Sequence, residues 1–170
     1  LSLVGSEICI RDSASTSSVP YSSAAVSKPT FIDIEDASWM WGILITDKDR
    51  VSTTGICNFP SHMGSLNYGY ASVGGWRRIS PKLYNQIPES DVRKGWFLDD
   101  TGVSVNLPAA AQAYITKKGA PVYTQVKYGP MNDEWGSNNN ATDVILMRVE
   151  EMYLIKAEAQ AMNLSLIHIS

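Results

Sequence analysis

One long stretch near the C-terminus constrains the fold of this chain more than any other feature. From Val144 to Met162 it contains no Gly or Pro and is rich in Leu, Met, Glu, Lys and Ala, which favour helices. Asp143 stands directly before it and can cap its first turn. The sequence therefore predicts a helix of about five turns over 143–162. Because its apolar residues leave almost no polar face, we expect it to pack inside a helical bundle.

Two carboxylates on this predicted helix, those of Glu151 and Glu158, are expected to be partly buried. Arg148 lies one turn from Glu151, and Glu151 shares a stripe of the helix with Glu158. A buried carboxylate needs a cation or several hydrogen-bond donors beside it. We therefore expect Arg148 to pair with Glu151, or with a carboxylate of a neighbouring helix, and not to bind a ligand.

Other local signals predict short elements joined by long loops. Residues 38–46 are typical of a strand, 53–75 of a long loop without periodicity, 122–128 of a second strand and 129–142 of a loop. Ser80 and Pro81 predict the start of a short helix that runs to residue 87, and Asp91 can cap a further turn. A third helix is predicted over 108–118, ended by Gly119.

Both ends of the chain differ from its middle. Residues 13–27 are rich in serine and are typical of a surface loop or linker. Residues 164–170 look like the translation of a sequencing adapter, and we expect them not to be native. The chain starts with Leu1, so we expect it to be a fragment of a longer protein.

Three blocks of the sequence carry motifs of one known family. Met147–Ala159 reads MRVEEMYLIKAEA and is similar to the motif hMR-x-x-E-h-Y-L-h-x-A-E-A. Ile79–Phe97 is similar to I-x-x-x-L-Y-x-x-I-P-x-x-D-x-R-x-x-W-F. Ser38–Ile43 is similar to the strand E-h-I/M-W-G-I, although Ser38 stands near the position where that motif often has Glu. In order and spacing these blocks resemble the SusD/RagB family, the nutrient-binding surface lipoproteins of Bacteroidota.

This resemblance implies a fold that is mainly α, with long loops and a few short strands. Residues 1–163 would be part of the family's C-terminal region, in which a tetratricopeptide-like helical scaffold carries a loop-rich subdomain. Most partner helices would then be absent, so we expect the chain to be poorly stable alone. The motif residues Trp41, Asp91, Arg93, Arg148, Glu151 and Glu158 would have structural roles.

The resemblance also implies a function. The parent protein would bind a glycan or oligosaccharide at the outer surface of the outer membrane and deliver it to a SusC-like TonB-dependent transporter. It would be held there by a lipid anchor on an N-terminal part outside this chain. It would bind without catalysis and without a cofactor. Two alternatives remain open: a peptide-binding member of the same family, and a helical scaffold that binds only its protein partner.

Charge and composition exclude other classes of function. The net charge is −3 and no basic stripe is present, which argues against nucleic-acid binding. The longest apolar run, 39–45, fits a strand and is too short to span a membrane. Cys9 and Cys57 allow one disulfide, but nothing in their spacing favours it over two free thiols. With His62 as the one other credible zinc ligand, we expect no metal site.

Aromatic side chains in the loops are the candidate ligand-binding residues. Sugar rings stack their C–H faces on flat aromatic rings, while amides and carboxylates bind the hydroxyls. The segment 67–76 places Tyr68, Tyr70 and Trp76 among small residues beside Asn67, and Trp135 lies in a second loop rich in Gly and Asn. These rings are expected either to bind the ligand or to anchor their loops to the core.

The remaining aromatic and acidic candidates are expected to be structural. Trp41 and Trp96 lie in the framework motifs, where core packing is the expected role. Glu89 with Asp91, and Asp99 with Asp100, provide the paired carboxylates that a glycosidase needs, but only by count. Asp91 and Arg93 are expected to form an ion pair in a turn. We therefore expect no enzymatic activity.

Overall fold

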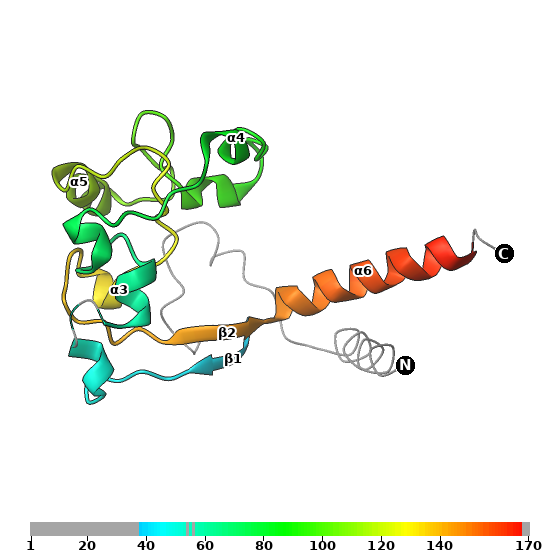
Figure 1. Cartoon of the computed structure of the whole chain (residues 1–170), viewed down its shortest axis with the longest axis horizontal. Coiled ribbons are helices and arrows are strands. Elements are labelled where there is room, and N and C mark those ends of the chain that lie inside the picture. Colours follow the sequence, from blue (N-terminus) through cyan, green and yellow to red (C-terminus); the bar gives the residue numbers. More distant parts are fainter. Residues whose placement is uncertain (1–37, 54, 56, 168–170) are drawn as a thin grey trace. The chain divides into compact units, whose positions relative to one another are not determined.

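The computed structural model describes residues 38–53, 55 and 57–167, which fall into two units (Figure 1). The described part of the first unit comprises residues 38–42 and 145–167, and that of the second comprises residues of 43–144. The predicted serine-rich loop at 13–27 and Cys9 lie outside the described residues. Cys57 is exposed and carries a free thiol.

The described residues form a small mixed fold of short helices, long loops and one two-stranded sheet. Its strands are β1 (Trp39–Ile43) and β2 (Val144–Arg148), and its α-helices are α3 (Phe59–Met63), α4 (Pro81–Tyr84), α5 (Ala109–Lys117) and α6 (Val149–Ile167). Four 3-10 helices lie between them, η1 (Arg50–Thr53), η2 (Tyr70–Val73), η3 (Val92–Trp96) and η4 (Met131–Asp133). None of the helices in this described part is long and apolar enough to cross a membrane.

The predicted helix over 143–162 begins later than expected. Residues 144–148 form strand β2, which pairs with β1, and α6 begins at Val149. Asp143 does not cap a helix, because its Oδ1 accepts a hydrogen bond from the backbone N–H of Ile45 at 2.8 Å. The β-branched Val144 and the pairing with a partner strand outweigh the helical propensity of these residues.

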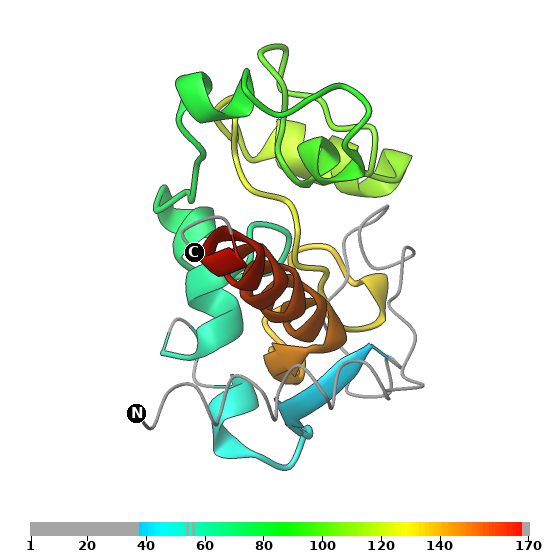
Figure 2. The same cartoon turned by 90° about the vertical axis from the view of Figure 1, so that its right-hand side faces the viewer.

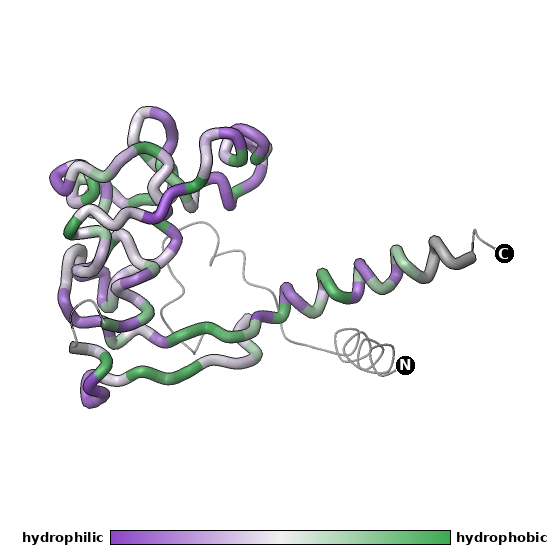
Figure 3. Tube along the Cα trace, in the orientation of Figure 1, coloured by the Kyte–Doolittle hydropathy of each residue, from purple (hydrophilic) through white to green (hydrophobic). Residues whose placement is uncertain are grey.

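The burial expected along this helix is also wrong. Val149 and Met152 are buried, but Glu151 and Glu158 are exposed and Leu154 is 70% exposed. α6 is one uninterrupted helix (Figure 2), and apolar and polar residues alternate along it (Figure 3). The sequence motif therefore predicted the helix correctly, but not which of its side chains are buried in this chain.

Arg148 does not pair with Glu151. Its Nη2 lies 2.6 Å from Oε1 of Glu150 and donates a second hydrogen bond, of 3.1 Å, to Oγ of Ser38. The backbone N–H of Val149 also donates to the carbonyl of Ser38 at 2.9 Å. Two of the three motif blocks, 110 residues apart in sequence, thus meet at the Arg148 side chain.

The second unit has its core between α5 and the loops around it. Five buried residues form this core, Leu66, Leu98, Ala111, Ile115 and Val126. α5 presents Ala111 and Ile115 on one face, as a spacing of four residues requires. The predicted helix 108–118 is confirmed within one residue at each end: Pro108 precedes α5, and Gly119 ends it with φ +68°.

Two loop predictions need correction. The segment 53–75 is not without helix, because it contains α3, whose first turn is capped by Asn58 Oδ1 at 2.9 Å from the N–H of Ser61, and η2. The segment 122–128 is not a strand and makes isolated bridges, Arg78 with Thr124 and Phe97 with Gln125. Tyr123 adopts φ +65°, which interrupts the extended chain.

Candidate functional site

The structure brings together the two loops that the sequence marks as ligand-binding candidates. The N–H of Tyr68 donates to the carbonyl of Ser137 at 2.8 Å, and the N–H of Gly136 donates to the carbonyl of Leu66 at 2.8 Å. Asn67 Nδ2 donates to Oδ1 of the buried Asn140. These bonds join 66–68 to 136–140 across about 70 residues of sequence, as the 73-residue separation of the two asparagines illustrates.

The aromatic residues of these loops have different roles in the fold. Tyr68 is 41% exposed. Tyr70 is half-buried, and its ring centroid lies 4.4 Å from that of His62. Trp76 and Trp135 are partly buried and pack against the core. Of these four rings, Tyr68 therefore offers the most accessible surface to a ligand.

Asn67 and Trp41 also differ from their expected environments. Asn67 is buried, with its side-chain amide bonded to Asn140, so its position is that of a loop anchor. Trp41, which was expected to pack in a core, is 63% exposed on β1 and that prediction is wrong. Trp96 is half-buried, and Lys127 Nζ lies 4.7 Å from its ring centroid.

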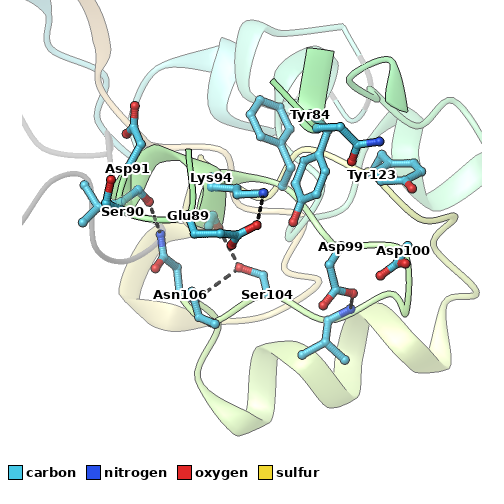
Figure 4. Close-up of a pocket in the computed structure, with 16 residues that line it drawn as sticks. Tyr84, Glu89, Ser90, Asp91, Lys94, Asp99, Asp100, Ser104, Asn106 and Tyr123 are labelled. Carbon is cyan, nitrogen blue, oxygen red and sulfur yellow. Dashed lines mark hydrogen bonds and ion pairs between the residues drawn. The ribbon is translucent and has the colours of Figure 1, made fainter. Parts of the chain in front are cut away.

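A second candidate site is a cavity of about 560 Å³ in the same unit (Figure 4). This volume lies within the range of roughly 300–1,000 Å³ that ligand pockets occupy. Its walls come from the motif block 84–97, the turn 99–106 and Tyr123. The sequence did not predict this site, because Tyr123 comes to lie beside the segment 84–106 only in the folded chain.

The first wall of the cavity, residues 84–97, is positioned by hydrogen bonds that cap α4 and η3. Ser80 Oγ accepts from the N–H of Leu83 at 3.3 Å, and Pro81 fits the first turn of α4 as predicted. α4 ends at Tyr84, three residues earlier than expected, and turns continue to Ile87. Asp91 caps η3 by accepting from the N–H of Arg93 at 3.0 Å.

The predicted ion pair of Asp91 and Arg93 is confirmed. Arg93 Nε lies 2.9 Å from Oδ1 of Asp91, and Arg93 Nη2 lies 2.6 Å from Oδ2. The side-chain hydrogen bonds from Arg93, helped by its backbone N–H, lower the pKa of Asp91 to about 2. The same bonds raise the pKa of Arg93. Asp91 is therefore an ionised structural partner.

A second ion pair and two tyrosine rings line the middle of the cavity. Lys94 Nζ lies 2.5 Å from Oε1 of Glu89 and 4.9 Å from the ring centroid of Tyr84. The rings of Tyr84 and Tyr123 are 5.2 Å apart and tilted by 57°. The hydrogen bond to Glu89 raises the pKa of Lys94, and burial raises the pKa of Tyr84.

The turn after Leu98 forms the opposite wall. Asp99 Oδ1 accepts from the N–H of Thr101 at 2.8 Å, from its Oγ1 at 2.7 Å and from the N–H of Val103 at 2.9 Å. Burial acts to raise the pKa of Asp99, but these hydrogen bonds outweigh it, so the pKa is lowered. Ser104 Oγ donates to the carbonyl of Gly95 at 2.6 Å and accepts from the N–H of Asn106 at 3.2 Å.

Four acidic residues line this cavity, and two of them have shifted pKa values. The carboxylate pairs that the sequence offered by count, Glu89 with Asp91 and Asp99 with Asp100, all line this cavity. A glycosidase acid needs a raised pKa. Asp91 and Asp99 have lowered pKa values, which makes them hydrogen-bond acceptors and poor proton donors.

Neither a group of metal ligands nor a similar known protein was found for the described residues and the chain, respectively. Among the described residues, no three His, Cys, Asp or Glu side chains are grouped as metal ligands. Comparison of the chain with models of known protein families, with characterised proteins and with solved structures gave no match.

Proposed function

We propose that this chain is part of a SusD/RagB-like protein that binds a glycan without reacting with it. The parent would act at the outer surface of the outer membrane, held by a lipid anchor, and would pass the glycan to a SusC-like TonB-dependent transporter. The three motif blocks of the sequence support this assignment. The hydrogen bond of 3.1 Å between Arg148 and Ser38, which joins the first and last of these blocks, is consistent with it.

The observation that carries the proposal is the junction of the two aromatic loops. Tyr68 is exposed, and its backbone is bonded to Ser137. The next residue, Asn138, is exposed as well. An exposed aromatic ring beside amide groups suits a sugar. The aromatic ring stacks on the C–H face of the sugar, and the amides bind the hydroxyl groups of the sugar. Bonding between the loops holds this surface in place before the ligand arrives, which lowers the entropy cost of binding.

Binding without catalysis is the activity that the carboxylates support. Asp91 is paired with Arg93, and its pKa of about 2 keeps it ionised. Asp99 is held by donors of its own turn, and its pKa is also lowered. A test for reducing-sugar release from polysaccharides checks this part of the proposal. We expect no release, and sustained release would contradict it.

The test of binding is a glycan array followed by affinity-gel electrophoresis of the purified chain and of Tyr68→Ala. Because Trp76 packs on the core, the single variant is cleaner than one that also removes that ring. Loss of an aromatic contact worth about 0.5–1.5 kcal/mol weakens binding roughly two- to tenfold. Val73→Ala is the matched control, because Val73 is an exposed apolar residue of the same loop.

Three other outcomes would contradict the proposal. Equal glycan binding by Tyr68→Ala and the unchanged chain would place the site elsewhere. Binding to mixed oligopeptides and not to glycans would favour the peptide-binding alternative. Binding to neither would favour a scaffold that recognises only its protein partner.

A further inference from the structure

We propose that the cavity between 84–97, 99–106 and Tyr123 is a second ligand site, which takes a sugar ring without acidic groups. The ligand class rests on the proposed function, but the site is a different one. None of the residues that line the cavity belongs to the loop 67–76 or to the segment 135–140. Four observations carry this inference: the aromatic wall, the backbone of Tyr123, the fixed polar wall and the charge.

The aromatic wall is formed by Tyr84 and Tyr123. Figure 4 shows the two rings next to Asp99 and Asp100. The rings are tilted by 57° with centroids 5.2 Å apart, so their faces are not stacked on each other. Lys94 Nζ occupies a position over Tyr84, 4.9 Å from its centroid. Tyr123 is therefore the ring that we assign to contact with the sugar.

The backbone of Tyr123 is held in a conformation that its side chain does not favour. Its φ of +65° lies in the left-handed region, where Gly or Asn is accommodated at lower cost. Two hydrogen bonds fix this geometry, from the N–H of Tyr123 to Leu98 and from the N–H of Ile79 to the carbonyl of Tyr123, both of 3.1 Å. Strained residues that are fixed in this way concentrate at ligand sites. The strain is explained if the ring has to lie in the cavity wall.

The polar wall is fixed before any ligand binds. Asp99 accepts three hydrogen bonds from Thr101 and Val103, which set its carboxylate in one orientation. Asn106 is positioned through its backbone by Ser104, and its amide Nδ2 lies 3.4 Å from the carbonyl of Val92. Among the described residues, Asp100 has no hydrogen bond or ion pair, and its exposed carboxylate is free to accept bonds from sugar hydroxyls.

The charge of the side chains that line the cavity determines which sugars are attracted and which are repelled. Four carboxylates, those of Glu89, Asp91, Asp99 and Asp100, line the cavity with one ammonium group, that of Lys94. The ammonium is bonded to Glu89 at 2.5 Å and Arg93 pairs with Asp91, so among the described residues Asp99 and Asp100 are the lining carboxylates without an ion pair. A uronic acid or a sulfated sugar would bring a further negative charge into this field and be repelled. Hydroxyl groups, in contrast, can donate hydrogen bonds to the carboxylates.

The experiment measures the stoichiometry and affinity of binding by isothermal titration calorimetry. The probes are xylo-, cello-, malto- and galacto-oligosaccharides, oligogalacturonate as the acidic counterpart and chitosan oligosaccharide as the cationic one. The variants are Tyr123→Gly, which removes the ring and relieves the backbone, and Tyr68→Ala, which affects the other surface. Thermal melting confirms that each variant is folded.

Asp100→Lys tests the charge argument without disturbing the core. Asp100 is exposed and has no partner among the described residues, so the variant is expected to fold normally. It should weaken binding of the neutral sugar and strengthen binding of oligogalacturonate, with a shift in relative affinity of roughly tenfold or more. It remains informative if Tyr123→Gly does not fold.

The inference predicts two binding events in the unchanged chain. Tyr123→Gly should lose one of them and Tyr68→Ala the other, and oligogalacturonate should bind the cavity roughly tenfold more weakly than a neutral sugar. Full stoichiometry in Tyr123→Gly would overturn the cavity site and leave the proposed function standing. Binding of oligogalacturonate at the cavity that equals or exceeds binding of the neutral sugar would overturn the ligand class, whereas binding of chitosan oligosaccharide there would support it, because its ammonium groups complement the carboxylates. No sugar binding by any form would overturn both proposals together.

Discussion

Substitution of Gly69 by Ala is the sharpest test of how the Tyr68 loop is held. A Cβ atom at residue 69 would lie 2.5 Å from the carbonyl oxygen of Ser61, 2.7 Å from its Cα and 2.9 Å from its Cβ. Real Cβ atoms essentially never come within 3.0 Å of another heavy atom. Two of the three contacts are with backbone of α3, and Ser61 is completely buried, so no side-chain rotation relieves them.

The expected cost comes from crowding alone. The φ of Gly69 is 176°, an extended conformation open to any residue. Overpacking of this kind costs about 1–3 kcal/mol. For a chain of this length each kcal/mol lowers the melting temperature by about 2–4 °C, so we expect a decrease of about 2–12 °C. The loop must move away from α3, so glycan binding through Tyr68 should weaken as well.

The assay is thermal unfolding followed by circular dichroism, together with glycan binding. Gly74→Ala is the matched control, because a Cβ there meets nothing within 4 Å but φ is +94°. Gly74→Ala should cost about 1–2 kcal/mol because of the backbone conformation alone. This variant should leave Tyr68 in place. If Gly69→Ala melts and binds like the unchanged chain, the close packing of the loop against α3 is refuted.

Three further predictions concern other contacts. The pKa of Asp91 is lowered from 3.8 to about 2, so its ionised carboxylate stabilises the fold above pH 3.8 and this effect is lost as the pH falls towards 2. Asp91→Asn should therefore reduce the loss of melting temperature in acid. An unchanged dependence of the melting temperature on pH would contradict this. Arg148→Met should cost about 2 kcal/mol in urea denaturation, because it removes the bonds from Arg148 to Ser38 and Glu150, and a loss below a few tenths of a kcal/mol would contradict it. Leu98→Ala removes a fully buried core side chain and should cost about 2–5 kcal/mol in the same assay, so an unchanged urea midpoint would show that the core is placed wrongly.

The elements that the sequence predicted well are those with local signals. Ser80 with Pro81 marked the start of α4, and Asp91 marked the cap of η3. Gly119 marked the end of α5. In each case the deciding atoms lie within four residues of one another, so their geometry follows from the chain itself.

The failures occur where distant segments decide the structure. Residues 144–148 have strong helical neighbours, yet they pair with β1, about 100 residues away, as the bond between Ile45 and Asp143 across 98 residues illustrates. The alternation of 122–128 predicted a strand, but Tyr123 adopts a positive φ that no property of tyrosine signals. The cavity was missed for the same reason, since Tyr123 joins Tyr84 only after both have been placed by other contacts.

The three aromatic residues of the loop 67–76 illustrate why composition cannot identify a binding surface. Tyr68, Tyr70 and Trp76 are equally suited to a sugar by residue type. Gly69 approaches α3 closely, the ring of Tyr70 lies against that of His62, and Trp76 packs against the core. Tyr68 is left at the surface, 41% exposed. Exposure, and not residue type, therefore separates the three rings, and Gly69→Ala should change the exposure of Tyr68 without changing an aromatic residue.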